Sequence, residues 1–248
     1  MERRRPRTFT RINIGKIPLT NAELIKVLLL RKDNFPTVEL HLQQLRIAKE
    51  RDEIEQRLQD DSLWYFLRKR SATEAGKRIG YLFDLMAGQE GKKSHDPRAS
   101  YFWFYNRLAE AHGEAASSIL RCIDGLWLEV KRWFQTLLGW YEDHTLYHLI
   151  GYLVEYGGAE FSFTGLAEEV HGAPKDEFLR AVERRVGRSL KKREGKELKD
   201  IDVLGIGYED RQNVGKMLLL FNLHTILDSK RSDMRFPLRP LQARALGY

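Results

Sequence analysis

Apolar side chains recur every three or four positions between residues 116 and 141, and this is the strongest periodicity in the sequence. An α-helix turns once in about 3.6 residues, so side chains at this spacing fall on one side of it. The pattern therefore predicts one long helix with a single buried stripe. The stripe consists of Leu120, Ile123, Trp127, Val130, Phe134, Leu137 and Tyr141.

Helical signals dominate the rest of the chain as well. Thr20 and Glu23 form a capping box, in which each side chain accepts a hydrogen bond from the other residue's backbone N–H. The segment 23–30 is apolar on nearly all sides, which predicts a buried helix. Further helices are expected at 38–70 (one long or two abutting helices), 72–87, 144–156, 164–171, 175–191 and 211–228.

Alternating strand patterns are nearly absent from the sequence. Short extended pieces are expected only at 8–14 and 160–163. The polar segments 88–97 and 193–210 are predicted to be loops. The predicted fold class is therefore mainly α: a multi-helix bundle with at most a short extended segment at the N-terminus.

The composition of the 248 residues sets broad limits on function. No apolar run reaches the length of a membrane span, and no apolar stretch follows the basic start as in a secretory signal. The single Cys122 can form neither an internal disulfide nor a cysteine-based metal site. These features predict a cytoplasmic protein without a membrane partner. The net charge of +7 and the pI near 9.4 permit a polyanion partner such as nucleic acid or a nucleotide.

A turn near the N-terminus is a candidate phosphate site. Asn13, Gly15 and Lys16 combine a glycine, where the backbone could approach a phosphate, with a cation, and Arg11 adds a second cation. The spacing is not that of a Walker A loop. A purely structural turn is the alternative, and it is the more common use of such a glycine.

Two histidines, His144 and His148, lie four residues apart, which places both imidazoles on one side of a helix. No third ligand follows at helical spacing, so a core histidine bonded to a neighbouring carboxylate is the better interpretation than a metal site. No nucleophile-and-base pattern and no aspartate cluster for magnesium is present. The residues alone therefore indicate no catalytic site.

The segment 175–193 predicts an amphipathic, basic helix. Its apolar stripe is formed by Phe178, Val182, Val186 and Leu190. The opposite side and the end carry the predicted DNA-binding residues Arg180, Arg184, Arg188, Lys191 and Lys192. The residues 165–182 also have a helix–turn–helix cadence, although one spacing is a residue longer than usual. The alternative is an ordinary solvated surface.

Three long stretches, at 9–30, 126–154 and 215–238, resemble the N-terminal module of the GmrSD-type restriction endonucleases in sequence and order. Two shorter stretches, at 58–67 and 78–86, fit the same family. The resemblance implies a ParB-like nucleotide-binding fold with a helical extension, joined to an HNH-type nuclease domain. It implies NTP- and Mg²⁺-dependent cleavage of modified, often phage, DNA. Arg11, Asn13, Gly15 and Lys16 match the family's turn over the nucleotide pocket.

The sequence also departs from the family pattern at two places. The Asp-Gly-Gln-Gln-Arg motif that precedes this turn in the family is missing, and no Glu-His-Ile nuclease motif follows residue 238. The resulting hypothesis is that this chain is a fragment that neither catalyses a reaction nor binds a cofactor on its own. A DNA- or protein-binding helical subunit with a separately encoded ParB-like or HNH partner is one alternative. An autonomous NTPase or nuclease is the other.

The resemblance also predicts the organisation of the chain. Residues 1–36 would be a remnant of the nucleotide-side subdomain, 37–236 a helical domain, and 237–248 a linker toward a nuclease domain. Without the preceding strands, the helix at 23–30 either folds back onto the helical body or stays partly exposed. Marginal stability or self-association is therefore expected, with improved solubility on Leu28→Asp.

Overall fold

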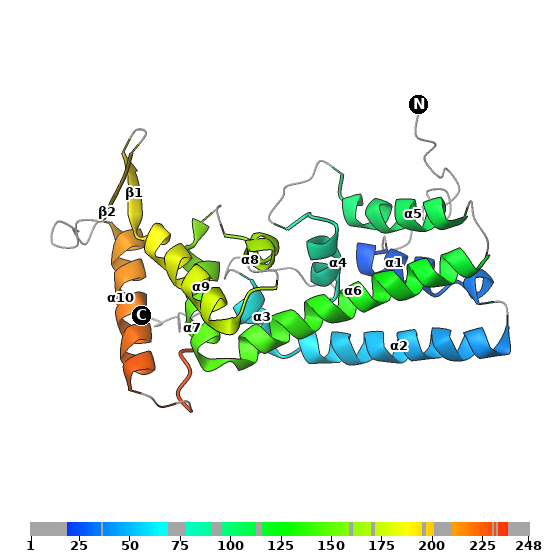
Figure 1. Ribbon diagram of the computed structural model, residues 1–248, viewed down its shortest axis with the longest axis horizontal. Coiled ribbons are helices and arrows are strands. Elements are labelled where there is room, and N and C mark those ends of the chain that lie inside the picture. The colour runs from blue at the N-terminus through cyan, green and yellow to red at the C-terminus, as the bar shows by residue number, and fades with distance from the viewer. Residues whose placement is uncertain are drawn as a thin grey trace, which may run out of the picture.

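The protein forms an elongated assembly of helices with one small hairpin (Figure 1). The computed structural model describes residues 19–35, 37–68, 78–90, 96–112, 116–158, 161–169, 172–194, 197–200, 210–229, 231 and 233–237. The α-helices are α1 Asn21–Leu29, α2 Val38–Leu58, α3 Asp61–Leu67, α4 Gly80–Met86, α5 Ala99–His112, α6 Ala116–Glu142, α7 His144–Tyr156, α8 Phe163–Glu169, α9 Lys175–Ser189 and α10 Arg211–Asp228. A short 3₁₀ helix at Lys32–Asn34 follows α1. The mainly α fold class is confirmed.

Helix α6 runs through most of the length of the molecule, and α2 lies beside it (Figure 1). Five residues of the predicted stripe of α6 are buried: Ile123, Trp127, Val130, Phe134 and Leu137. Polar side chains link α6 to α2, because Gln43 donates to Asp124 (2.6 Å) and Trp127 Nε1 donates to Glu50 (2.6 Å). Helices α3, α4, α5 and α7 pack on other parts of α6.

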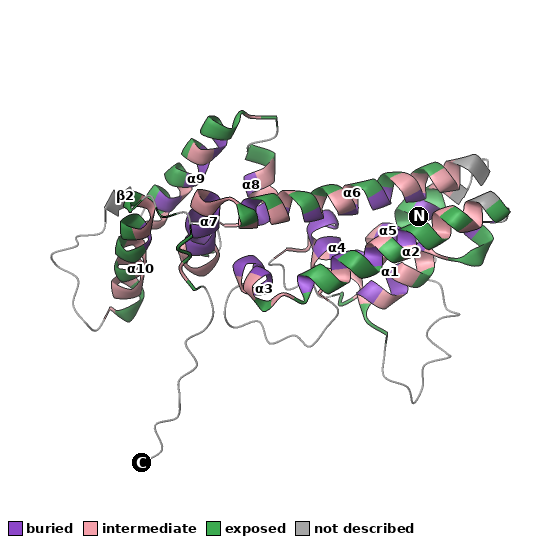
Figure 2. Cartoon of the chain, turned by 90° about the horizontal axis from the view of Figure 1, so that it is seen from below, coloured by how far each residue is buried: buried purple, intermediate pink, exposed green. Residues whose placement is uncertain are grey.

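The buried residues form one continuous apolar cluster. They are concentrated on α3, α4 and α7 (Figure 2). Near the junction of α6 and α7, the rings of Phe66 and Tyr147 stack with centroids 5.7 Å apart, and Trp140 stacks on Phe163 at 6.1 Å. The half of the molecule that contains α1, α2, α4 and α5 and the half that contains α3 and α7–α10 therefore share one core. No helix in the described part of the chain is long and apolar enough to span a membrane.

Helix α1 is covered by the rest of the chain. The predicted capping box of Thr20 and Glu23 is present, and Ile25 is fully buried. Helices α4 and α5 pack against α1, and Leu28 is half-buried against the core. Of the two outcomes expected for this helix, the structure shows the first, folding back onto the body. On this geometry we expect Leu28→Asp to destabilise the fold rather than to improve solubility, because the carboxylate would enter the edge of the core.

Helix α5 and the β1–β2 hairpin are not predicted by the sequence patterns. Helix α5 supplies the cover for α1 through its buried Phe104 and Leu108. Strands β1 Lys191–Glu194 and β2 Glu197–Asp200 pair antiparallel, with Lys191 opposite Asp200, where the sequence predicts the end of a helix and a loop. The predicted extended piece at 160–163 is not a strand in its described residues, because Phe163 begins α8. The piece at 8–14 lies outside the described residues.

The burial of α1 generates a stability prediction. Ile25→Ala removes a fully buried side chain, so we expect the free energy of unfolding to fall by about 2–5 kcal/mol in chemical denaturation. Val27→Ala, on the same helix at a side chain that is 48% exposed, should change it by less than about 0.5 kcal/mol. Equal effects of the two substitutions would show that α1 is not part of the core.

Candidate nucleic-acid interface

Helix α9 is built as the sequence predicts over most of its length. Phe178, Val182 and Val186 are buried and face α7, on which the helix packs. The ring of Phe178 also contacts Trp140 of α6, with centroids 5.3 Å apart. The helix ends at Ser189, and Leu190 is its C-terminal cap, so the helix is two residues shorter than predicted. This packing fixes which side of α9 faces solvent.

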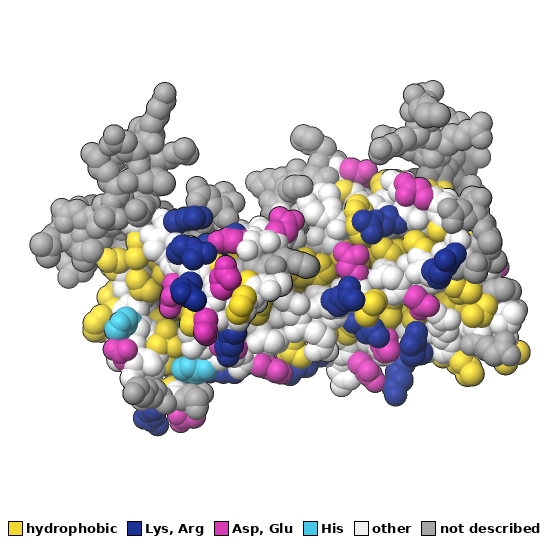
Figure 3. Space-filling view, in the orientation of Figure 1, with side chains coloured by type: hydrophobic (Ala, Val, Ile, Leu, Met, Phe, Trp, Pro, Cys, Tyr) yellow, Lys and Arg dark blue, Asp and Glu magenta, His cyan; other side chains and the backbone are white. Residues whose placement is uncertain are grey.

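The three arginines of α9 share the solvent side, as the spacing predicts. Arg180, Arg184 and Arg188 are all exposed. Lys and Arg side chains form a column over α9 in the space-filling view, with Asp and Glu side chains beside it (Figure 3). Arg180 Nε donates to Asp176 O within the helix (3.2 Å). Arg184 lies 3.7 Å from Glu169 of α8, with more than half of its side chain exposed (56%). We call Arg180, Arg184 and Arg188 the arginine row.

A fourth arginine, Arg185, supports the row and is not predicted by the sequence. Its Nε donates to Glu169 Oε2 (2.7 Å) and its Nη2 to Gly165 O (2.9 Å), so it joins α8 to α9. The hydrogen bond from Arg185, with the charges of the neighbouring arginines, lowers the pKa of Glu169 below its usual value. Glu169 is therefore a carboxylate at neutral pH, and it neutralises part of the positive charge beside Arg184.

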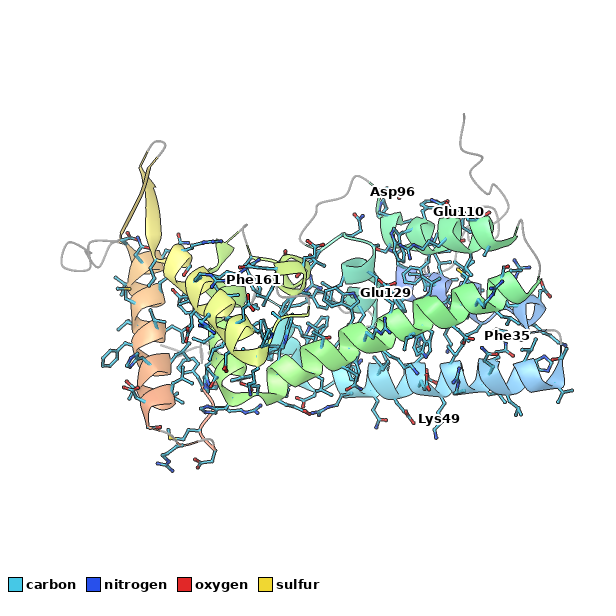
Figure 4. All side chains as sticks on the ribbon, in the orientation of Figure 1. Phe35, Lys49, Asp96, Glu110, Glu129 and Phe161 are labelled. Atoms are coloured by element: carbon cyan, nitrogen blue, oxygen red, sulfur yellow. The ribbon has the colours of Figure 1, made fainter. Side chains whose placement is uncertain are left out.

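A small cleft of about 110 Å³ lies at the C-terminal end of the row, lined by Leu153, Gly157, Phe161, Arg185, Arg188 and Ser189. The backbone approaches closely here: a Cβ at Gly157 would lie 2.5 Å from Leu153 O and 2.6 Å from Phe161 Cβ. Phe161 is labelled in Figure 4. Two arginines line this cleft, and the guanidinium of Arg185 is already bonded to Glu169 and Gly165 O, so Arg188 is the arginine there that is suited to bind a phosphate oxygen.

The geometry supports a helix–turn–helix less well than it supports phosphate contact by the arginine row. Helices α8 and α9 are present and are separated by residues 170–174. In that motif the N-terminal residues of the second helix contact the bases. Here the first turn of α9 carries Asp176 and Glu177, which would repel DNA. The row further along α9 is the better candidate for contact with phosphates.

The other predicted site residues are placed differently or lie outside the described part. Lys191 and Lys192 belong to strand β1 rather than to the end of α9, because the helix stops before them; their side chains lie outside the described residues. The predicted nucleotide-side residues Arg11, Asn13, Gly15 and Lys16 lie outside the described residues as well. Their role remains a prediction.

His144 and His148 are held by backbone groups. His148 is fully buried; its Nδ1 lies 2.7 Å from His144 O, and its Nε2 accepts a hydrogen bond from the N–H of Phe236 (3.0 Å). Both ring nitrogens are therefore occupied, and the partners are backbone groups rather than the expected carboxylate. The described residues contain no group of three or more side chains suited to hold a metal ion.

The same contacts fasten the segment 234–236 to the junction of α6 and α7. Arg235 donates to the carbonyls of Tyr141 (3.1 Å) and Glu142 (2.7 Å), which end α6, and Tyr147 Oη donates to Phe236 O (2.9 Å). The guanidinium of Arg235 also lies over the rings of Tyr141 and Tyr147. The segment that follows α10 is therefore bonded to the core at the junction of α6 and α7.

Comparisons with protein-family models, with curated proteins and with solved structures found no match for this chain.

The buried His148 generates a prediction about pH. Burial lowers the pKa of His148; the hydrogen bond to the His144 carbonyl opposes this shift, while the charges of the His144 side chain and of Arg235 add to it, so the folded state favours the neutral ring. The unfolded chain then binds more protons below its ordinary pKa of about 6.5, and stability falls as the pH drops from 7 toward 5. His148→Gln should reduce this fall in the free energy of unfolding between pH 7 and pH 5, measured by urea denaturation. An unchanged slope in the His148→Gln variant would contradict the assignment.

Proposed function

We propose that this chain is a DNA-binding helical subunit of a GmrSD-type, modification-dependent restriction system that acts in defence against phage. The observation that supports the DNA contact is the arginine row, exposed on the side of α9 that faces away from the core. The resemblance of five sequence stretches supports the assignment to this kind of system. Cleavage and nucleotide turnover, in this proposal, need a ParB-like or HNH partner encoded separately.

The row has dimensions that suit a phosphate backbone. Successive members are four residues apart, so the row rises by about 6 Å per step and spans roughly 12 Å. Phosphates on one DNA strand follow each other every 3.4 Å or so along the axis, so the row could reach a few of them. Arginine is suited to this contact because its guanidinium can donate two parallel hydrogen bonds to one phosphate.

Acidic neighbours limit the strength of this contact. Glu177 lies on the same side of α9 as the row, and Glu183 flanks it, both exposed. Glu169 competes with DNA for Arg184. A moderate, salt-sensitive affinity follows from this balance, suited to a subunit that binds DNA together with a partner rather than alone.

The DNA contact is tested by removing the row. Changing Arg180, Arg184 and Arg188 together to Gln should weaken duplex binding and lower the slope of log K against log salt by roughly 0.9 per lost phosphate contact. The fold should survive, because all three side chains are exposed. Fluorescence anisotropy across a salt series measures both quantities. Glu177→Gln removes a repulsive charge from the same side and should tighten binding.

A matched control separates the row from overall charge. Arg46, Lys49 and Arg57 are exposed on α2, and Lys49 points away from α6 (Figure 4). Changing these three to Gln lowers the net charge by the same amount. If this control weakens binding as much as the row variant does, binding reflects overall charge, and the proposed interface is wrong.

The partner requirement gives a separate prediction. The purified chain should show no NTP hydrolysis and no cleavage of plain or modified DNA with Mg²⁺ or Mn²⁺. Turnover that co-purifies with the chain through several columns would contradict this part of the proposal and favour an autonomous NTPase or nuclease.

A further inference from the structure

Helix α10 forms one end of the molecule and is barely covered (Figure 1, Figure 2). Its segment 217–221 is wholly apolar, although polar residues lie on either side of this segment in the sequence. Among the residues that the structure describes on α10, only Leu223 is buried; the inner side packs on α7. Two of its apolar side chains are nevertheless largely exposed: Phe221 at 72%, and Leu218, at the edge of a cleft shared with α7, at 60%. Two neighbouring large apolar side chains that are exposed to this extent make a surface suited to a further partner.

The outer side has the residue spacing of a coiled-coil seam. Arg211, Val214, Leu218, Phe221, Thr225 and Asp228 follow each other at alternating steps of three and four residues. This 3-4 alternation keeps side chains in one narrow stripe that a second helix can cover. The hydroxyl of Thr225 donates to Phe221 O (2.9 Å), and Asn222 at the edge donates to Leu218 O (2.8 Å). Their polar groups are thus satisfied within α10, so covering the stripe leaves them paired.

The stripe is also symmetric about the middle of the helix. The midpoint of α10 falls between Leu219 and Leu220; Leu218 and Phe221 lie equally far from it, and Arg211 and Asp228 are the two ends. In an antiparallel pair of α10 helices, Leu218 would oppose Phe221 of the other copy and Arg211 would oppose Asp228. A parallel pair would instead bring Arg211 against Arg211 and Asp228 against Asp228.

We propose that a second copy of this chain covers this face, through antiparallel pairing of the two α10 helices about a two-fold axis at their midpoints. A self-complementary patch is what a two-fold dimer requires. The opposite charges at the helix ends set the antiparallel direction, and the apolar centre supplies the attraction. The inference is independent of the proposed DNA contact.

The area that the two α10 helices can bury sets the expected affinity of the dimer. A helix of 18 residues is about 27 Å long, and one helix pair covers less than the roughly 800 Å² per partner of a standard stable interface. The dimer should therefore be weak, with a dissociation constant on the order of 10–100 µM. Sedimentation equilibrium of the full chain between about 5 µM and 1 mM covers this range.

Two sets of variants test the pairing. Phe221→Glu places a charge at the centre of the stripe and should abolish dimerisation, whereas Leu42→Glu, at an exposed leucine of α2 (66% exposed), should leave it intact. Arg211→Glu and Asp228→Arg should each weaken the dimer about tenfold by opposing like charges, and the double variant should restore it. Both charge changes agree with the helix dipole, so neither is expected to unfold α10.

Each outcome decides the proposal. Concentration-dependent dimerisation that Phe221→Glu removes, and that the double charge swap restores, supports it. A monomer at 1 mM overturns it, and then residues of this chain or a different protein cover α10. A dimer unaffected by Phe221→Glu overturns it in favour of another surface, and a dimer that the double swap fails to restore overturns the antiparallel pairing.

Discussion

The buried stripe of α6 is the constraint on which the rest of the structure depends. Ile123, Trp127, Val130, Phe134 and Leu137 are buried, and α3, α4, α5 and α7 all pack on the helix that carries them. Because one helix serves both halves, their packing is coupled. Helix α9 contacts α6 through Phe178, whose ring lies beside that of Trp140 near the end of α6. The orientation of the arginine row therefore depends on the same core.

The sequence predicts elements well where periodicity and caps agree. Helices α7 and α10 begin and end at the predicted residues, and α6 extends only one residue beyond its predicted range, 116–141. The hairpin is missed because its strands, KKRE and ELKD, show no alternation of apolar and polar residues. Helix α5 is missed because its aromatic residues are adjacent, so they give no clear stripe. Both misses arise where tertiary contacts, rather than local pattern, determine the structure.

Part of the candidate site could likewise be predicted from the sequence, and part could not. Exposure of the arginine row follows from helical spacing alone, because Val182 and Val186 must face inward. The roles of Arg185 and Glu169 could not be predicted, since they depend on how α8 lies against α9. The partner of His148 Nε2 could not be predicted either, because it is the backbone N–H of Phe236, 88 residues away in sequence. Spacing identifies which residues share a face, but it does not identify the groups that meet that face from elsewhere.

The proposed DNA contact is tested most directly by mapping where DNA lies on the protein. Photo-cross-linking of a short duplex to the full chain, with the cross-linked residues located by mass spectrometry, gives that map without altering the surface. The account predicts cross-links on the solvent side of α9 around Arg180, Arg184 and Arg188, lost at high salt. Cross-links concentrated on α2 or on another surface away from α9, or binding without any cross-link to α9, would contradict it.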